Sequence, residues 1–198
     1  MAGQSGNARR PGRRTGDSGT RETILATALE MFAERGFAAT SVRAIAKQAE
    51  VDPALVRHFF GTKQELFTTA VIDRSEIAGR LTEALDGPTE RIGERLVRTY
   101  FGMWENPDTG QVMRTLFRSA VSDEDLAPLF VRTMLANLQD RTSDTETSAR
   151  LTRMPLIAPQ ILGVAVCRYV LRIPGIADAP LEDLVHRLAP QVQKELVG

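Results

Sequence analysis

Residues 36–66 read GFAATSVRAIAKQAEVDPALVRHFFGTKQEL, and this stretch decides the fold. Within 42–49, apolar residues recur at i, i+3, i+4 and i+7, the pattern of an amphipathic helix. Asp52-Pro53 follows, and these residue types are favoured as the N-cap and first residue of a helix. Thr62 and Glu65 have the spacing of a capping box. The stretch therefore predicts three helix starts in close succession.

The connection between the first two of these helices is short, about Glu50 to Asp52. So short a turn makes helices cross steeply, as in a helix-turn-helix. In the helix over 53–60, Val56, Phe59 and Phe60 share one face and can pack inward, whereas Arg57 and His58 fall on the other. We interpret this segment as a recognition helix that reads double-stranded DNA.

Neighbouring residues complete the predicted DNA contacts. The N-terminus of a helix attracts phosphate, and a hydroxyl or an ammonium group there adds donors. Thr40 and Ser41 stand at the start of the second helix, and Lys63 stands at the start of the fourth. The predicted DNA-binding residues are Thr40, Ser41, Arg43, Pro53, Ala54, Leu55, Arg57, His58 and Lys63.

The rest of the chain also has helical periodicity, and no segment shows sustained alternation, so we expect an all-α protein of nine helices. Gly36 has the position of a residue that ends the first helix. A three-helix head is expected to precede a body of about six helices. The expected helices span about 20–36, 40–49, 52–60, 62–86, 89–105, 109–120, 123–141, 148–172 and 181–197.

Three parts are predicted along the chain. Residues 1–19 are rich in Gly, Ser and Arg and are expected to form a disordered basic arm, a solvated tail or a DNA contact. Residues 20–66 form the DNA-binding domain, from which the helix starting at residue 62 leads into a ligand-binding and dimerisation domain over 67–198. The net charge is zero, but residues 1–63 hold ten Lys/Arg against six Asp/Glu, which places the basic excess in the head.

Several classes of protein are disfavoured. With two histidines and one cysteine, the chain shows no metal-spaced cluster, phosphate loop or nucleophile elbow, so we expect neither an enzyme nor a cofactor or metal. A single cysteine forms no intrachain disulfide, which fits a cytoplasmic protein. No apolar run is long enough to span a membrane.

The segment Gly36–Ala46 resembles the TetR-family stretch G-[FY]-x-x-T-[ST]-V-R-x-I-A, and Phe60–Leu66 resembles its F-x-[ST]-K-x-x-L signature. The likeness covers about residues 20–70. Two positions depart from the family pattern. Glu50 stands where the family has glycine in the turn, and Arg57-His58 stands where a tyrosine is frequent. We therefore expect an operator particular to this chain.

The resemblance implies a homodimeric cytoplasmic regulator, usually a repressor, that binds a palindromic operator and releases it when a small-molecule effector binds. It implies an effector pocket in the body, for which the candidates are Tyr100, Met103, Trp104, Met113, Phe117 and Met134. It also implies dimerisation through the last two helices, for which the candidates are Leu162, Gly163, Val166, Val170, Leu184, Leu188 and Val192.

Some alternatives stay open. The apolar residues of the body could be plain core, and those of the last two helices could pack within one chain. Arg95, Arg114 and Arg118 could meet an acidic ligand or pair with Asp and Glu. The whole chain could instead be an activator, or a helical ligand-binding protein without repressor action.

Overall fold

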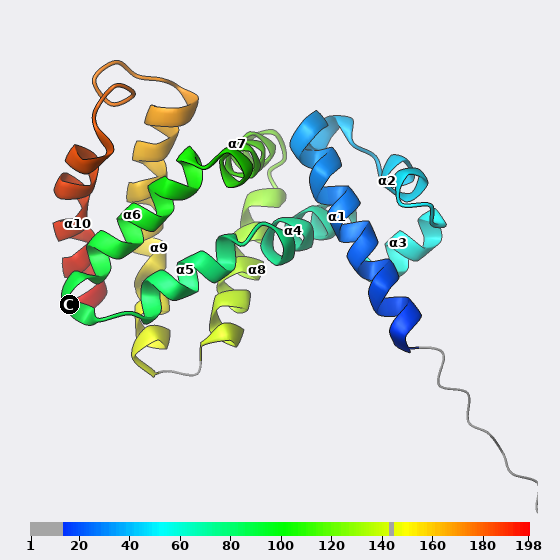
Figure 1. The fold of residues 1–198 in the computed structure, drawn as a ribbon, viewed down its shortest axis with the longest axis horizontal. Coiled ribbons are helices and arrows are strands. Elements are labelled where there is room, and N and C mark those ends of the chain that lie inside the picture. Colours follow the sequence, from blue (N-terminus) through cyan, green and yellow to red (C-terminus); the bar gives the residue numbers. More distant parts are fainter. Residues whose placement is uncertain (1–13, 143–144) are drawn as a thin grey trace, which may run out of the picture.

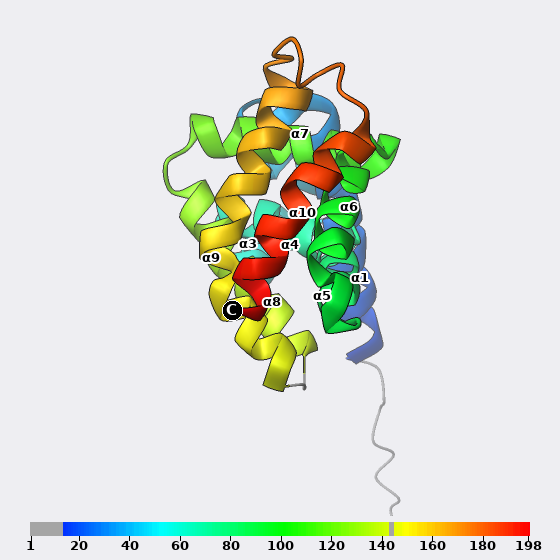
Figure 2. The same cartoon turned by 90° about the vertical axis from the view of Figure 1, so that its left-hand side faces the viewer.

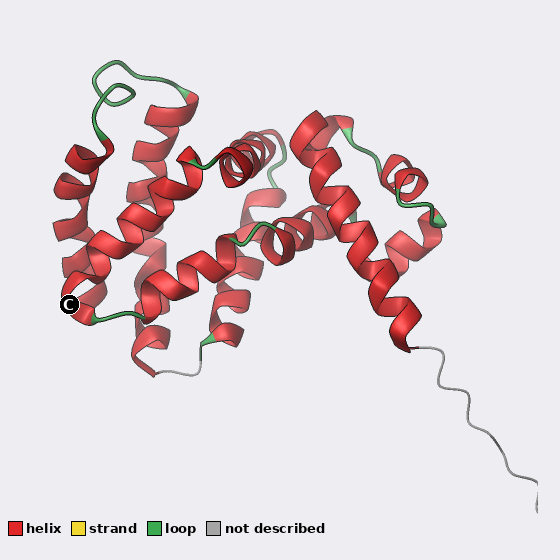
Figure 3. Ribbon diagram, in the orientation of Figure 1, coloured by secondary structure: helices red, strands yellow, loops and turns green. Residues whose placement is uncertain are grey.

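The computed structural model describes residues 14–142 and 145–198, and within these ranges every regular element is a helix (Figure 3). The all-α expectation is therefore confirmed. No helix of the described residues is long and apolar enough to cross a membrane. The elements are α1 (Arg14–Ala39), α2 (Val42–Gln48), α3 (Pro53–Phe60), α4 (Lys63–Arg74), α5 (Ile77–Asp86), η1 (Thr89–Arg91), α6 (Ile92–Glu105), α7 (Pro107–Ser122), α8 (Leu126–Arg141), α9 (Thr145–Ala165), the π-helical η2 (Val166–Val170) and α10 (Leu181–Val197).

Several boundaries differ from the expectation, and two of these differences change the description of the chain. The helix expected over 62–86 is two helices, because Glu76 adopts a left-handed conformation with φ 58° between α4 and α5. This break makes ten α-helices in the described ranges instead of nine. In addition, α1 begins at Arg14, so the last residues of the expected arm are helical. The rest of the arm lies outside the described residues.

The helices form a small head and a larger body (Figure 1). Helices α1, α2 and α3 make the head, α4 runs from it toward the body, and α5 to α10 make the body. In the head, the ring of Phe67 on α4 meets Phe32 and Phe37 edge-on, with centroid distances of 5.0 and 5.3 Å. These aromatic contacts fix α4 against α1. Helices α9 and α10 lie side by side at the end of the body farthest from the head (Figures 1 and 2).

Helices α6 and α10 cross at a glycine. A Cβ atom on Gly93 would lie 2.5 Å from the carbonyl oxygen of Ala189 and 2.5 Å from the backbone nitrogen of Gln193. The side chain of Gln193 accepts a hydrogen bond from the Gly93 N–H at 2.8 Å and donates one to the Thr89 carbonyl at 2.6 Å. Gln193 thus satisfies backbone groups at the start of α6, as a cap would.

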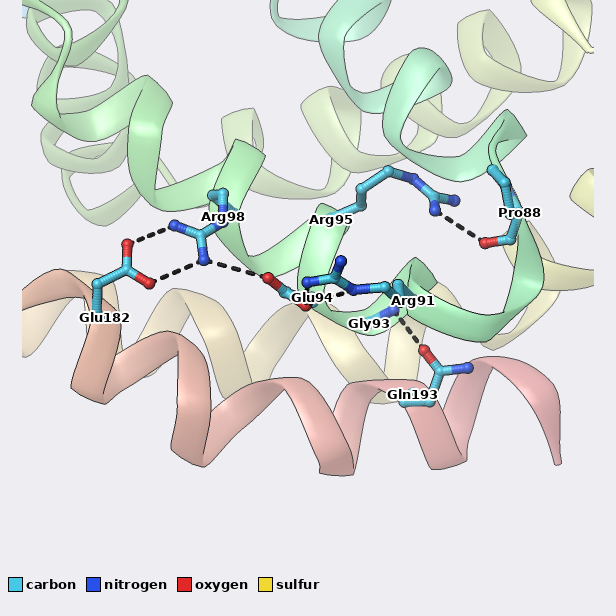
Figure 4. A network of polar contacts seen from close by, with 8 residues as sticks. All are labelled: Pro88, Arg91, Gly93, Glu94, Arg95, Arg98, Glu182 and Gln193. Carbon is cyan, nitrogen blue, oxygen red and sulfur yellow. Dashed lines mark hydrogen bonds and ion pairs between the residues drawn. The ribbon is translucent and has the colours of Figure 1, made fainter.

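A surface network continues along the same pair of helices (Figure 4). Arg98 on α6 pairs with Glu94 on its own helix at 3.2 Å and with Glu182 on α10 at 2.9 Å. Arg91 donates to the same Glu94. These arginines lower the pKa of Glu94 through hydrogen bonds. Because the groups are exposed, the ion pairs add little to the free energy of unfolding.

Two arginines hold the C-terminal end of α5. Arg95 on α6 donates from Nε to the Ala84 carbonyl at 3.1 Å, and Arg150 on α9 donates from Nη1 to the Leu85 carbonyl at 2.6 Å. Arg150 is only 4% exposed and also pairs with Glu146. The last carbonyls of a helix have no partner within the helix, so these guanidinium groups satisfy them and tie α5 to α6 and α9.

We predict that Gly93→Ala lowers the free energy of unfolding by about 1–3 kcal/mol, because the new methyl group would press on the backbone of α10. Gly102→Ala is the matched control in the same helix, since a Cβ there meets no atom within 4 Å. It should be neutral or stabilising by up to about 1 kcal/mol. Urea unfolding followed by circular dichroism measures both, and equal values for the two variants would contradict this close crossing.

Candidate nucleic-acid interface and internal cavity

The entry into α2 is built by Gly36 and Thr40. Gly36 has φ 80° and ψ 166°, a non-helical conformation that glycine adopts readily and that kinks α1 three residues before its end at Ala39. The Thr40 hydroxyl is buried and hydrogen-bonds to the Gly36 carbonyl at 2.8 Å and the Met31 carbonyl at 3.2 Å. Thr40 was expected to contact DNA, but its buried hydroxyl holds this turn, so we leave it out of the interface. Ser41 is exposed and caps α2 through Ala44 N at 3.1 Å.

The connection between α2, which ends at Gln48, and α3, which begins at Pro53, is as short as expected. Glu50 has φ 55°, a left-handed conformation that costs a residue with a Cβ about 1–2 kcal/mol. The Val51 N–H then donates to the Ala46 carbonyl at 2.9 Å. Asp52 caps α3 by accepting from Ala54 N at 2.7 Å, and Pro53 is the first helical residue. Local capping and one strained residue therefore set the angle between the two helices.

Helix α3 has a buried face and an open face. Val56 and Phe60 are 1% and 7% exposed and pack into the head, with Phe59 half-buried beside them. Arg57 and His58 are exposed on the open face. Of the other predicted contact residues, Pro53, Ala54 and Arg43 are exposed and Leu55 is half-buried. The structure thus brings these side chains to the surface of α2 and α3.

The start of α4 borders this surface. Thr62 N donates to Glu65 Oε2 at 2.7 Å and Glu65 N donates to Thr62 Oγ1 at 3.1 Å, so the expected capping box is present. The Thr62 N–H and the Thr62 hydroxyl, which donates to the same Oε2 at 2.8 Å, lower the pKa of Glu65. Lys63 is half-buried, with its Nζ 4.1 Å from the centre of the Phe37 ring. Partial burial lowers the pKa of Lys63, and nearby Asp123 opposes that shift.

The body encloses an apolar cavity of about 260 Å³ between α5, α6, α7, α8 and α9. Five of the six predicted pocket residues line it: Tyr100, Trp104, Met113, Phe117 and Met134. Met103 does not. It is fully buried elsewhere in the core, and its carbonyl accepts the Thr109 hydroxyl at 2.6 Å. The prediction for Met103 is corrected because this neighbour of Trp104 on α6 is not part of the cavity wall.

The predicted dimer residues do not share one surface. Leu184 and Val192 are 8% and 2% exposed within the single chain, so they belong to its own core and we leave them out of any interface. Leu162 is 39% exposed and lines the mouth of the cavity. Gly163 is exposed. Val166, Val170 and Leu188 are half-buried.

Some contacts between the parts were not visible in the sequence. Gln64 at the start of α4 donates to Asp123, just before α8, at 3.3 Å, and Gln111 on α7 donates to the Ala33 carbonyl of α1 at 2.9 Å. Tyr169 stacks on Trp104 with ring centroids 5.4 Å apart and an interplanar angle of 8°. These partners are far apart along the chain, and no local pattern pairs them.

The geometry defines a helix-turn-helix head joined to a helical body with an internal cavity. Residues 24–70 match the family model described as bacterial regulatory proteins, tetR family, and residues 90–196 match the one described as tetracyclin repressor-like, C-terminal domain. The chain therefore belongs to the TetR family of transcriptional regulators.

Individual relatives agree with this assignment. A solved TetR-family regulator from Streptomyces coelicolor is 32% identical, with a TM-score of 0.64, and the match covers 94% of this chain and 99% of that one. An HTH-type transcriptional repressor of Mycobacterium tuberculosis is 41% identical over 86 residues, which are 42% of this chain and 44% of the repressor. The multidrug binding protein EbrR, solved with imidazole, shares the fold at 21% identity and a TM-score of 0.57, over 94% and 97% of the two chains.

We predict that Glu50→Gly raises the free energy of unfolding by about 0.5–1 kcal/mol, because glycine relieves the left-handed strain in the turn but gains freedom in the unfolded chain. Glu50→Ala is the control, since it removes the charge but keeps a Cβ at φ 55°. Chemical denaturation measures both. A gain as large for alanine as for glycine would show that charge, not backbone strain, governs this position.

Proposed function

We propose that this protein is a homodimeric repressor that leaves its operator when a small molecule fills the cavity of the body. The observation that carries the proposal is the open face of α3, where exposed Arg57 and His58 stand on a helix whose other face is buried. An exposed short helix of this kind fits the major groove of DNA, where arginine can hydrogen-bond to guanine.

Phosphate contacts are assigned to the residues around α3. Ser41 caps α2 and Lys63 begins α4, so each places a donor at a helix N-terminus beside the recognition helix. Such contacts position the protein on the duplex, whereas Arg57, His58 and Leu55 read the bases. Two heads of a dimer would meet successive major grooves about 34 Å apart, which requires a palindromic operator.

The dimer contact is assigned to the exposed face of α9 with the neighbouring part of α10. Leu156, Pro159 and Gly163 recur at i, i+3 and i+7 and are exposed, and Leu156 is 66% exposed. No atom lies within 4 Å of the position that a Cβ of Gly163 would take, so a partner helix could approach closely there. Leu188 on α10, which is half-buried, is assigned to the same contact.

The coupling between the cavity and the head is assigned to α7 and α8. Both helices line the cavity. Helix α7 reaches the head through the hydrogen bond from Gln111 to the Ala33 carbonyl, and α8 packs on α4, whose Gln64 donates to Asp123 just before α8. A ligand that binds more tightly to one arrangement of α7 and α8 shifts the population of head positions by that difference in affinity.

We predict that Arg57→Ala weakens binding to a duplex selected from a random pool by the wild-type protein by about 1–3 kcal/mol and relaxes its sequence preference. Lys63→Ala should weaken binding and reduce the slope of log affinity against log salt by about 1. Arg141→Ala is the control, since Arg141 is exposed at the end of α8. Fluorescence anisotropy at several salt concentrations measures all three.

Wild-type affinity in both the Arg57 and Lys63 variants would overturn this assignment of the interface. If the wild-type protein selects no duplex at all, the alternative of a helical ligand-binding protein without repressor action is favoured. A reporter gene under the selected operator separates repression from activation.

We predict that Leu156→Glu turns the dimer into a monomer, because each copy would bury a carboxylate in the apolar contact. Val121→Glu is the control, since Val121 is 73% exposed on α7. Sedimentation velocity measures the molecular mass of both variants. A Leu156→Glu protein that stays dimeric would place the contact on another face.

A further inference from the structure

We propose that the cavity accepts an uncharged, mainly aromatic molecule of one or two rings with a single hydrogen-bond acceptor, which the indole N–H of Trp104 recognises. This inference rests on the proposed function in one respect, namely that the cavity is the effector site. What it adds is the chemistry of the ligand, which membership of the family does not specify.

The cavity wall carries no charge to pair with a charged ligand. None of the nineteen residues that line it is Asp, Glu, Lys, Arg or His. Arg95, a candidate for an acidic ligand from the sequence, binds the end of α5, and Arg114 and Arg118 are not part of the wall. Moving an unpaired carboxylate or ammonium group into such a site costs several kcal/mol, so neutral molecules are strongly preferred.

The volume sets the size of the ligand. A cavity of about 150 Å³ is enough to bind benzene in a protein interior. The present cavity, at about 260 Å³, has room for more than one ring of that size. It is below the range of about 300–1,000 Å³ that drug-sized ligands occupy. The aromatic side chains of Tyr100, Phe117 and Phe130 line the cavity and favour an aromatic ligand.

Trp104 and Tyr100 supply the only side-chain nitrogen and oxygen atoms among the lining residues. Trp104 is 2% exposed, and its Nε1 has no hydrogen-bond partner in the described part of the chain. The Tyr100 hydroxyl is close enough to the indole to affect its own pKa, but Nε1 and this hydroxyl do not meet the geometry of a hydrogen bond. Burial raises the pKa of Tyr100 to about 12, and the neighbouring indole acts against that shift. Because a buried N–H without a partner is costly, a small turn of the indole that brings this N–H to an acceptor on the ligand would be favoured.

The indole of Trp104 is packed against Tyr169. The two rings stack, and the Tyr169 hydroxyl donates to Glu105 at 3.0 Å. Because this packing already restricts the Trp104 side chain, less side-chain conformational entropy is lost when a ligand binds. The ligand has a way in, because Val131 on α8 and Leu162 on α9 line the cavity and are also 54% and 39% exposed.

Four compounds of similar size test the proposal: 1-tetralone, tetralin, 1-naphthoate and the ammonium form of 1-naphthylmethylamine. Isothermal titration calorimetry on the DNA-free protein measures each affinity. We expect tetralone to bind, tetralin to bind about 3- to 10-fold more weakly for want of the acceptor, and the two ions not to bind at the same concentrations. The single tryptophan of the chain gives a second, optical readout for the wild-type protein.

Two variants locate the binding. Trp104→Phe keeps an aromatic ring without the N–H and should abolish the advantage of tetralone over tetralin. Ala158→Leu fills space at the wall and should weaken both neutral compounds at least tenfold, whereas Ala136→Leu, exposed on α8, should leave them unchanged. Thermal unfolding by circular dichroism checks that each variant is folded.

Binding of either ion as tightly as tetralone would overturn the proposal, and so would failure of both neutral compounds to bind the wild-type protein. An advantage of tetralone that persists in folded Trp104→Phe would overturn the role of the indole. The proposed function is tested separately: if tetralone binds but leaves DNA affinity unchanged, the ligand chemistry stands and the coupling to DNA fails.

Discussion

The packing of Phe67 against Phe32 and Phe37 places the first turns of α4 inside the head. Because α4 leaves the head in the direction of the body, these three rings fix the angle at which the recognition surface is presented. The same cluster holds Lys63, whose ammonium group lies over the Phe37 ring. A substitution in this cluster would therefore disturb DNA positioning and the link to the body together, although none of the three rings faces solvent.

The local parts of the fold were predictable from the sequence because their causes are local. The caps of Asp52 and Thr62 depend on residues within three positions. Glu50, which stands where the family has glycine, adopts the left-handed conformation that glycine favours. The break at Glu76 was missed because the apolar spacing continues across it. No feature of the local sequence indicates that Glu76 adopts a positive φ angle.

The errors at candidate sites have a different origin. A stripe on a helix shows which residues are buried but not which neighbour buries them. The stripe on the last helix therefore predicts a subunit contact at Leu184 and Val192, although both pack within the chain. Met103 and Trp104 are adjacent on α6 and equally buried, yet only Trp104 reaches the cavity. The hydroxyl of Thr40 turns inward, which depends on the path of the backbone after Gly36.

The cavity also has a consequence for how long the protein survives in a cell. Empty space in a protein core costs about 24 cal/mol per Å³ relative to the same core filled. A chain that carries such a space unfolds more often when it is empty, and a ligand that fills it raises the folded fraction by mass action. Since proteases degrade the unfolded state, the ligand-bound protein would be degraded more slowly than the empty protein. The concentration of the ligand would then also affect the steady-state concentration of the protein that binds it.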